Sequence, residues 1–97
     1  MNNVRQDHKF QYITFILERD TGKTQLWRCQ NIEHGDKLGQ IQWYGPWRQY
    51  CFVCCSGVVL SAGCLKDVQV FIERLMEAHK NEIAARASAR NDRIVDG

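Results

Sequence analysis

Four of the five cysteines lie close together in the sequence, and cysteine thiolates at short spacing are the ligands of tetrahedral zinc sites. Cys51 and Cys54 have the Cys-x-x-Cys spacing, and Cys55 and Cys64 follow. Zinc knuckles set such a pair on a tight turn that glycine usually supplies, and no glycine lies between Cys51 and Cys54. On an extended strand, residues i and i+3 point to opposite faces. We therefore predict free thiols and no metal or other cofactor.

Cys64 is also a candidate nucleophile, because it lies in the first turn of a predicted helix, where the helix dipole lowers the pKa of a thiol. Asp67, one turn further on, works against that shift. His8, His34 and His79 are spread over a tail, a turn and the helix, so no base is paired with Cys64. Paired carboxylates, a phosphate loop and a dinucleotide fingerprint are absent from the sequence. These observations predict a binding protein and not an enzyme, with no catalytic residues.

The ten residues from Trp43 to Phe52 contain five aromatic side chains and a single charge, on Arg48. Gly45-Pro46 interrupts this block, because proline donates no backbone hydrogen bond and fixes its φ angle. Trp47 and Arg48 are then expected at a rigid corner between two strands, partly exposed. Tryptophan and arginine are enriched where binding energy concentrates, and together they also form stacking platforms for bases. The alternative is that these rings close the sheet edge and fill the core, which is the role we expect for Trp43.

The elements that position these residues are an antiparallel sheet and one long helix, which is an α+β fold. Aromatic and β-branched runs separated by turn residues predict four strands, at residues 10–19, 24–31, 38–44 and 50–55. Residues 58–60 are a short apolar segment that either leads into the helix or supplies a fifth, edge strand. Ser61 is a good N-cap, and apolar residues follow it at helical spacing. The stripe consists of Leu65, Val68, Phe71, Ile72, Leu75 and Met76, then more weakly His79 and Ile83.

The alternation of side chains sorts the sheet into two faces. Trp27, Cys29, Ile41 and Trp43 share one face, which we expect the helix to cover. The opposite face then carries Arg28, Gln30, Gln40, Gln42 and Tyr44. This set of amides, a guanidinium and a ring suits hydrogen bonding and stacking with a ligand. The alternative is that these residues are polar only because the solvent-exposed side of any single-layer sheet is polar. The candidate binding residues are Trp47, Arg48, Tyr44, Arg28, Gln40 and Gln42.

Length and composition indicate one domain of 97 residues, of which 44% are apolar. We divide it into a loose tail (1–9), a β-meander (10–60), a helix (61–90) and a frayed tail (91–97). The net charge of +2 gives no overall nucleic-acid footprint. Lys80, Arg86, Arg90 and Arg93 form a weak basic set that acidic residues interrupt, and we interpret it as a solvated helix face.

The polar first residues predict no secretory signal, and no apolar run is long enough to cross a membrane. Together with the odd number of cysteines, this predicts reduced thiols and a location in the cytoplasm of the host cell. Residues beyond Lys80 have little of their own domain to pack on, which predicts a homodimer.

The block from Trp43 to Phe52, with Cys64-Leu65-Lys66-Asp67-Val68 and the Phe71-Ile72 helix, resembles a group of short uncharacterised proteins of phages, prophages and other mobile elements. The resemblance covers residues 23–76, and the Trp-Tyr-Gly-Pro-Trp-Arg block is its specific part. It implies a phage-type context and brings no activity or catalytic residues with it. The chain departs from the pattern at Val53-Cys54-Cys55, where an aromatic residue and a proline are expected.

Two functions fit these observations. The first is the binding of single-stranded nucleic acid, a function found in dimeric proteins of related strand–helix topology, of the transcription-coactivator and Whirly type, with which we see no shared motif. The alternative is a protein-binding inhibitor of a host defence protein, like an anti-CRISPR protein. Binding to nucleic acid would weaken steeply with salt, whereas a protein contact would depend mainly on Trp47.

Overall fold

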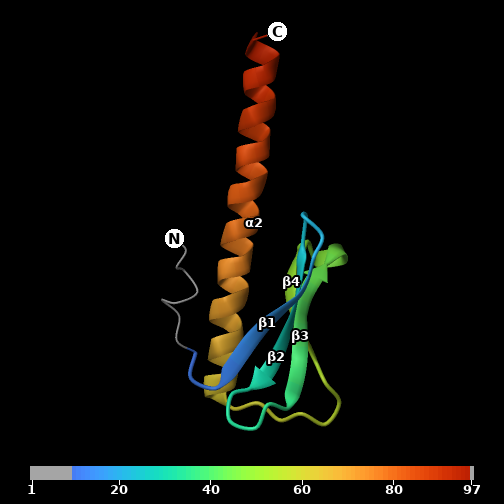
Figure 1. Ribbon diagram of the computed structural model, residues 1–97, viewed down its shortest axis with the longest axis vertical. Coiled ribbons are helices and arrows are strands. Elements are labelled where there is room, and N and C mark those ends of the chain that lie inside the picture. The colour runs from blue at the N-terminus through green and yellow to red at the C-terminus, as the bar shows by residue number, and fades with distance from the viewer. Residues whose placement is uncertain (1–9, 97) are drawn as a thin grey trace.

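Four antiparallel strands form one sheet in the order of the sequence, and a long helix lies across one face of that sheet (Figure 1). The computed structural model describes the backbone of residues 10–96 and the side chains of residues 10–87. The elements are β1 (Ile13–Asp20), β2 (Gln25–Asn31), β3 (Lys37–Tyr44), β4 (Gln49–Cys54) and α2 (Ala62–Asp96). The predicted α+β fold is confirmed. The predicted loose tail, residues 1–9, lies outside the described residues.

Short polar side chains close the turns between the strands. In the β1–β2 turn the carboxylate of Asp20 accepts a hydrogen bond from the backbone N–H of Gly22 at 2.9 Å. Gly22 has a φ of +88°, which a residue with a Cβ adopts only at a cost. In the β2–β3 turn the side-chain oxygen of Asn31 accepts from the backbone N–H groups of Glu33 and His34. Such local bonds are why asparagine and aspartate mark turns in a sequence.

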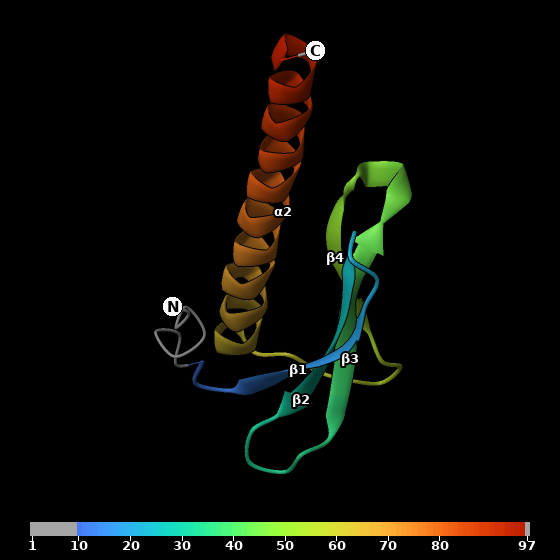
Figure 2. The same cartoon turned by 45° about the horizontal axis from the view of Figure 1, so that its top comes forward.

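The hydrophobic core lies between the sheet and α2 (Figure 2). Ile13, Cys29 and Ile41 are fully buried there, and Phe15 of β1 stacks on Phe71 of α2 with ring centroids 4.1 Å apart. The expectation that the helix covers the face of Trp27, Cys29 and Ile41 is confirmed, because all three are buried. Trp43, on the same face, is half-buried against His79 and Tyr50, as expected of a structural residue.

A glycine is required where β3 passes β4. A Cβ on Gly39 would collide with the backbone oxygen of Val53 and with the ring of Phe52. The neighbouring strand therefore leaves no room for a side chain at this position of β3.

The start of α2 confirms the predicted N-cap, since the hydroxyl of Ser61 accepts a hydrogen bond from the backbone N–H of Cys64 at 3.2 Å. Val68, Phe71 and Leu75 are buried as predicted. The prediction was wrong for Leu65, whose side chain is 53% exposed. Leu65 lies on the flank of the stripe, and the buried position nearest the start of β1 is taken by Asp67 instead. The carboxylate of Asp67 accepts from the backbone N–H groups of Tyr12 (2.9 Å) and Ile13 (3.2 Å).

Two predicted boundaries differ from the structure. Residues 58–60 form no fifth strand but an irregular connection, in which Val59 is 91% exposed. A side chain so open to water has no burial to favour pairing with the sheet. The helix, predicted to end at residue 90 with a frayed segment after it, keeps helical backbone to Asp96. Within the described residues, no helix combines the length and apolar character that a membrane span needs.

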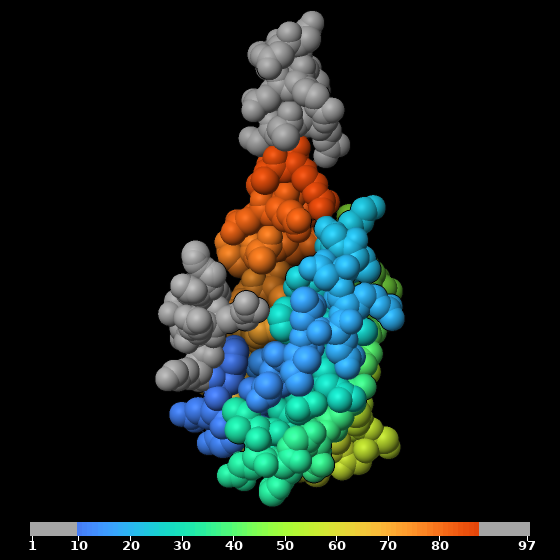
Figure 3. All heavy atoms as spheres, in the orientation of Figure 1, coloured from blue at the N-terminus to red at the C-terminus, as the bar shows by residue number. Residues whose placement is uncertain are grey.

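The prediction of a homodimer concerns the second half of α2. Residues 80–87 are all exposed where the helix rises past the sheet (Figure 3). In this stretch Arg86 donates to the backbone oxygen of Gly22 at 3.1 Å, and Ile83 is exposed. We expect a homodimer that uses this part of α2 or a sheet edge. Light scattering at high micromolar concentration should give twice the mass of the chain, and a monomer mass would contradict the prediction.

Candidate binding surface

The face of the sheet turned away from α2, called here the outer face, carries one row of residues across all four strands. The strand register aligns Ile16 of β1 with Arg28 of β2, Arg28 with Gln40 of β3, and Gln40 with Val53 of β4. Gln42 and Tyr44 follow Gln40 on the same face, because side chains alternate along a strand. The structure thus places Arg28, Gln40, Gln42 and Tyr44 on one surface, as the sequence predicted.

The polar side chains of the outer face are held by one another. Gln40 donates to the amide oxygen of Gln42 at 2.7 Å, and Lys37 donates to the amide oxygen of Gln40 at 3.4 Å. Arg28 donates to Gln30 at 3.4 Å. Planar amides fixed in this way keep further donors and acceptors for a ligand, since each amide group can make four hydrogen bonds.

Arg28 is the cation at the centre of the row, and an acid lies beside it. Its Nε lies 3.4 Å from a carboxylate oxygen of Glu18, and both side chains are more than a third exposed. A pair this exposed contributes little to stability, because water screens it. The carboxylate nevertheless offsets part of the positive charge that Arg28 brings to the surface.

The corner predicted at Gly45-Pro46 is a short 3-10 turn, Gly45–Trp47, with proline in its first positions. Arg48 ends the turn in the left-handed region, at φ 55° and ψ 49°, and its N–H donates to the backbone oxygens of Tyr44 and Gly45. Non-glycine residues adopt this conformation rarely and at a cost, so the turn constrains Arg48 strongly.

Trp47 is 66% exposed at this corner, and the prediction that it lies partly in solvent is confirmed. Its ring packs edge-on against Tyr44, with centroids 5.1 Å apart. Arg48 is exposed next to it. Trp47, Arg48 and Tyr44 therefore form an aromatic and cationic cluster at the end of β3, next in line after the amides of Gln40 and Gln42.

Two members of this surface were missed by the sequence analysis. Ile16 and Val53 are the two end residues of the row that crosses all four strands, and both are exposed. The signal that identifies them is the alternation of side chains within the two edge strands, β1 and β4. They add apolar area at both ends of a polar row.

The cysteines are distributed as the extended-strand argument requires. The register of β3 and β4 sets Cys51 opposite Gln42 of the outer face and Cys54 opposite Gly39 of the helix-facing side. The two side chains of the Cys-x-x-Cys pair therefore diverge. Among the described residues no group of three or more metal-ligating side chains comes together.

We accordingly expect the purified protein to carry no stoichiometric zinc. Elemental analysis of the folded protein checks this directly. One zinc per chain, together with loss of the fold on chelation, would contradict the prediction, because that result requires the two thiolates to converge.

Cys29 behaves differently from the other cysteines because it is fully buried beneath α2. Burial raises the pKa of its thiol from 9.0 to about 12, and the neighbouring Cys55 adds to the shift. The folded state therefore keeps the Cys29 proton over a pH range in which the unfolded chain releases it.

This difference predicts the stability of the protein in alkali. Since the unfolded chain binds fewer protons between pH 9.0 and about 12, the free energy of unfolding falls as pH rises through that window. The loss attributable to Cys29 is at most about 1.4 kcal/mol per pH unit. Denaturant titrations of the wild type and of Cys29→Ala should show a shallower decline for the variant. Parallel curves would mean that Cys29 is not held protonated.

The sequence comparisons fit the phage-type resemblance. No family model matches the chain, and no solved structure matches it. An uncharacterised 9.3 kDa protein of Acholeplasma phage L2 is 35% identical over 71 residues, which cover 72% of this chain and 91% of the phage protein. At that identity and coverage, the chain belongs to the same family as this small phage protein.

Proposed function

We propose that the outer face and its corner bind single-stranded nucleic acid. The observation that carries the proposal is the 66% exposed ring of Trp47, which lies beside Arg48 and beyond the hydrogen-bonded amides of Gln40 and Gln42. The ring is in contact with the exposed ring of Tyr44, so the two form a joined aromatic patch, and exposed patches of this kind mark binding sites where single exposed side chains do not.

The chemistry of the surface suits unpaired bases. A base stacked on an aromatic ring contributes about 1–3 kcal/mol, and Tyr44 and Trp47 offer two neighbouring rings. The amides of Gln40 and Gln42 can donate hydrogen bonds to base edges and accept hydrogen bonds from them. These edges are free in a single strand, whereas in a duplex they are paired with the other strand. Arg48 lies next to the rings, and Arg28 and Lys37 lie beside Gln40, so we expect these three cations to contact the phosphates of a bound strand.

The salt dependence of binding tests this proposal. Three neutralised phosphates predict a slope of log affinity against log salt of roughly −2 on a single strand. Fluorescence anisotropy of a labelled oligothymidylate measures the slope, and Arg48→Met should make it shallower by about 0.7. Lys66→Met is the matched control, because Lys66 is exposed on α2, on the other side of the sheet. Absence of binding at low salt would refute the proposal.

A protein partner is the second candidate, and two observations favour it. Ile16 and Val53 are exposed on the outer face, and Glu18 offsets the charge of Arg28. A mixed surface of aromatic, arginine and aliphatic residues with little net charge is typical of the centre of a protein interface. The partner would then be a host protein that the phage-type protein inhibits.

A pull-down from host lysate with and without nuclease distinguishes the two candidates. Capture of one defined protein that survives nuclease and is lost with Val53→Asp supports the protein partner. Loss of all captured material on nuclease treatment supports nucleic acid. Val53 suits this test because it is an exposed side chain of the edge strand β4, where a charge leaves the core intact.

A further inference from the structure

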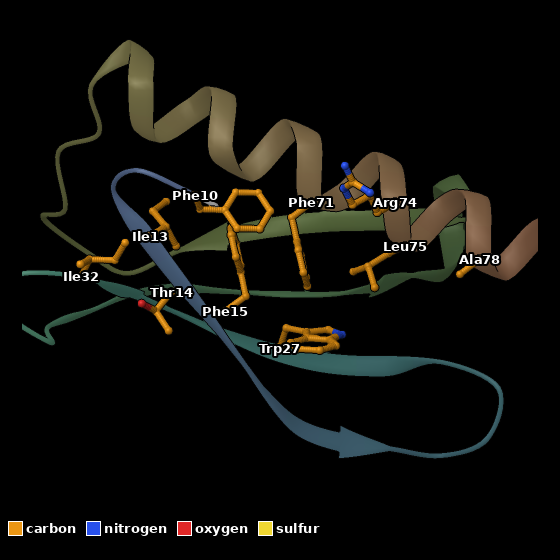
Figure 4. A pocket seen from close by; sticks show the side chains of 10 residues that line it. All are labelled: Phe10, Ile13, Thr14, Phe15, Trp27, Ile32, Phe71, Arg74, Leu75 and Ala78. Carbon is orange, nitrogen blue, oxygen red and sulfur yellow. The ribbon is translucent and has the colours of Figure 1, made fainter. Parts of the chain in front are cut away.

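An apolar groove lies on the other side of the sheet, between the edge strand β1, β2 and α2 (Figure 4). Its volume is about 440 Å³, within the range of about 300–1,000 Å³ that small-molecule sites occupy. Its walls include Phe10, Phe15, Trp27, Phe71, Leu75 and Ala78. The groove shares none of these residues with the outer face.

The aromatic wall of the groove is ordered by ring contacts. Phe71 stacks on Phe15, and it meets Trp27 edge-on with centroids 4.9 Å apart. Phe10 meets Phe15 and Phe71 edge-on, at 4.8 and 5.8 Å. Interlocked rings of this kind restrict one another, so the apolar surface is formed before any ligand arrives.

One charged residue, Arg74 of α2, lines this groove. Its Nε atom is buried and has no hydrogen-bond partner among the described residues. A buried guanidinium nitrogen without a partner destabilises the folded state, because it has lost its hydrogen bonds to water and gained none in return. Of the residues three and four positions from Arg74 along α2, Val70, Phe71 and Ala78 are apolar and supply no side-chain acceptor. The fourth, the exposed Glu77, forms no ion pair with Arg74 in the described part of the chain.

We infer that this groove binds a small amphipathic carboxylate, with its apolar chain against the aromatic wall and its head group at Arg74. A carboxylate matches the planar guanidinium fork and supplies the acceptor that Nε lacks. The aromatic walls supply the apolar contact, and Ala78 leaves the end of the groove open for the chain. This site is independent of the proposed function, because its residues lie on the helix side of the sheet.

Calorimetric titration with decanoate, at concentrations below micelle formation, tests the inference. The expected result is saturable binding of one decanoate per chain. Arg74→Met keeps the length of the side chain and removes the charge, and it should weaken decanoate binding about tenfold or more. Decan-1-ol has the same chain without the anion, so its weaker binding should be unaffected by Arg74→Met. Lys66→Met, which removes an exposed cation from the same helix, should change neither affinity.

A second variant tests the groove itself without removing the charge of Arg74. Ala78→Phe fills the groove from an exposed helix position and should abolish binding of both ligands, while circular dichroism confirms that the fold is retained. Decanoate binding that is absent, or that survives both Arg74→Met and Ala78→Phe, would overturn the inference. A dimer that Ala78→Phe dissociates, without decanoate binding, would show a second copy of the chain in the groove and would also overturn it.

Discussion

Trp47→Ala is expected to leave the free energy of unfolding within about 0.5 kcal/mol of the wild-type value and to weaken binding of the partner about thirtyfold. The reason is the place of the ring. Trp47 is 66% exposed and contacts Tyr44 at the corner, so its removal opens no cavity in the core. If the ring is the stacking platform or the hot spot, truncation removes that contact and little else. Denaturant unfolding and binding titrations on the same preparation measure both quantities.

Trp27→Ala is the matched control for this prediction. Trp27 is 8% exposed, packs on Phe71, and donates from its indole nitrogen to Gln25 at 3.1 Å. Truncation of such a residue costs about 3–5 kcal/mol of stability through the cavity that it leaves. If Trp47→Ala instead destabilises the protein as much as Trp27→Ala does, the corner is part of the core and the binding proposal fails.

Asp67→Ala is expected to lower the free energy of unfolding by about 2–5 kcal/mol, because it leaves two buried or half-buried backbone donors without an acceptor. The Asp67 carboxylate is 9% exposed and accepts from the N–H groups of both Tyr12 and Ile13. Bonds to a charged acceptor are about twice as strong as neutral ones. Asp67→Asn, which keeps one acceptor oxygen, should cost less than the alanine variant.

Glu77→Ala provides the control for Asp67, since it removes an exposed carboxylate from the same helix and should change stability by no more than about 0.5 kcal/mol. Amide exchange adds a local measurement. The N–H groups of Tyr12 and Ile13 should lose protection in Asp67→Ala before the centre of β2 does. Equal stabilities for the Asp67 and Glu77 variants would show that the link between α2 and β1 contributes nothing to the fold.

The sequence alone determined the features that depend on local periodicity and turn chemistry. Alternation placed Trp27, Cys29 and Ile41 on the buried face, and Arg28 and Gln40 on the other, because neighbouring side chains of a strand point to opposite sides. Ser61 marked the start of the helix because its hydroxyl can accept from an N–H that has no partner in the first turn. These are interactions between residues that are close in the sequence.

The corner was also predictable, for a related reason. Proline cannot continue the ladder of β3, so the residues after Gly45-Pro46 had to leave the sheet. Exposure of Trp47 followed from that interruption. Its function did not follow, because exposed tryptophan and arginine are equally suited to stacking with bases and to a contact with another protein.

The tertiary structure decided what depends on residues far apart in the chain. Asp67 reads in the sequence as an acidic residue near the start of a helix, and only the docking of α2 brings its carboxylate to Tyr12, 55 positions away. Leu65 belongs to an apolar stripe by spacing, yet it is exposed on the flank of that stripe, and Asp67 takes the buried position beside the start of β1. The groove beside Arg74 arises in the same way, from rings of β1, β2 and α2 that meet only in the folded chain. Local patterns specify which face of an element is apolar, whereas the position of one element on another is set by packing between them, and buried donors, cavities and unpartnered charges exist only after that packing has formed.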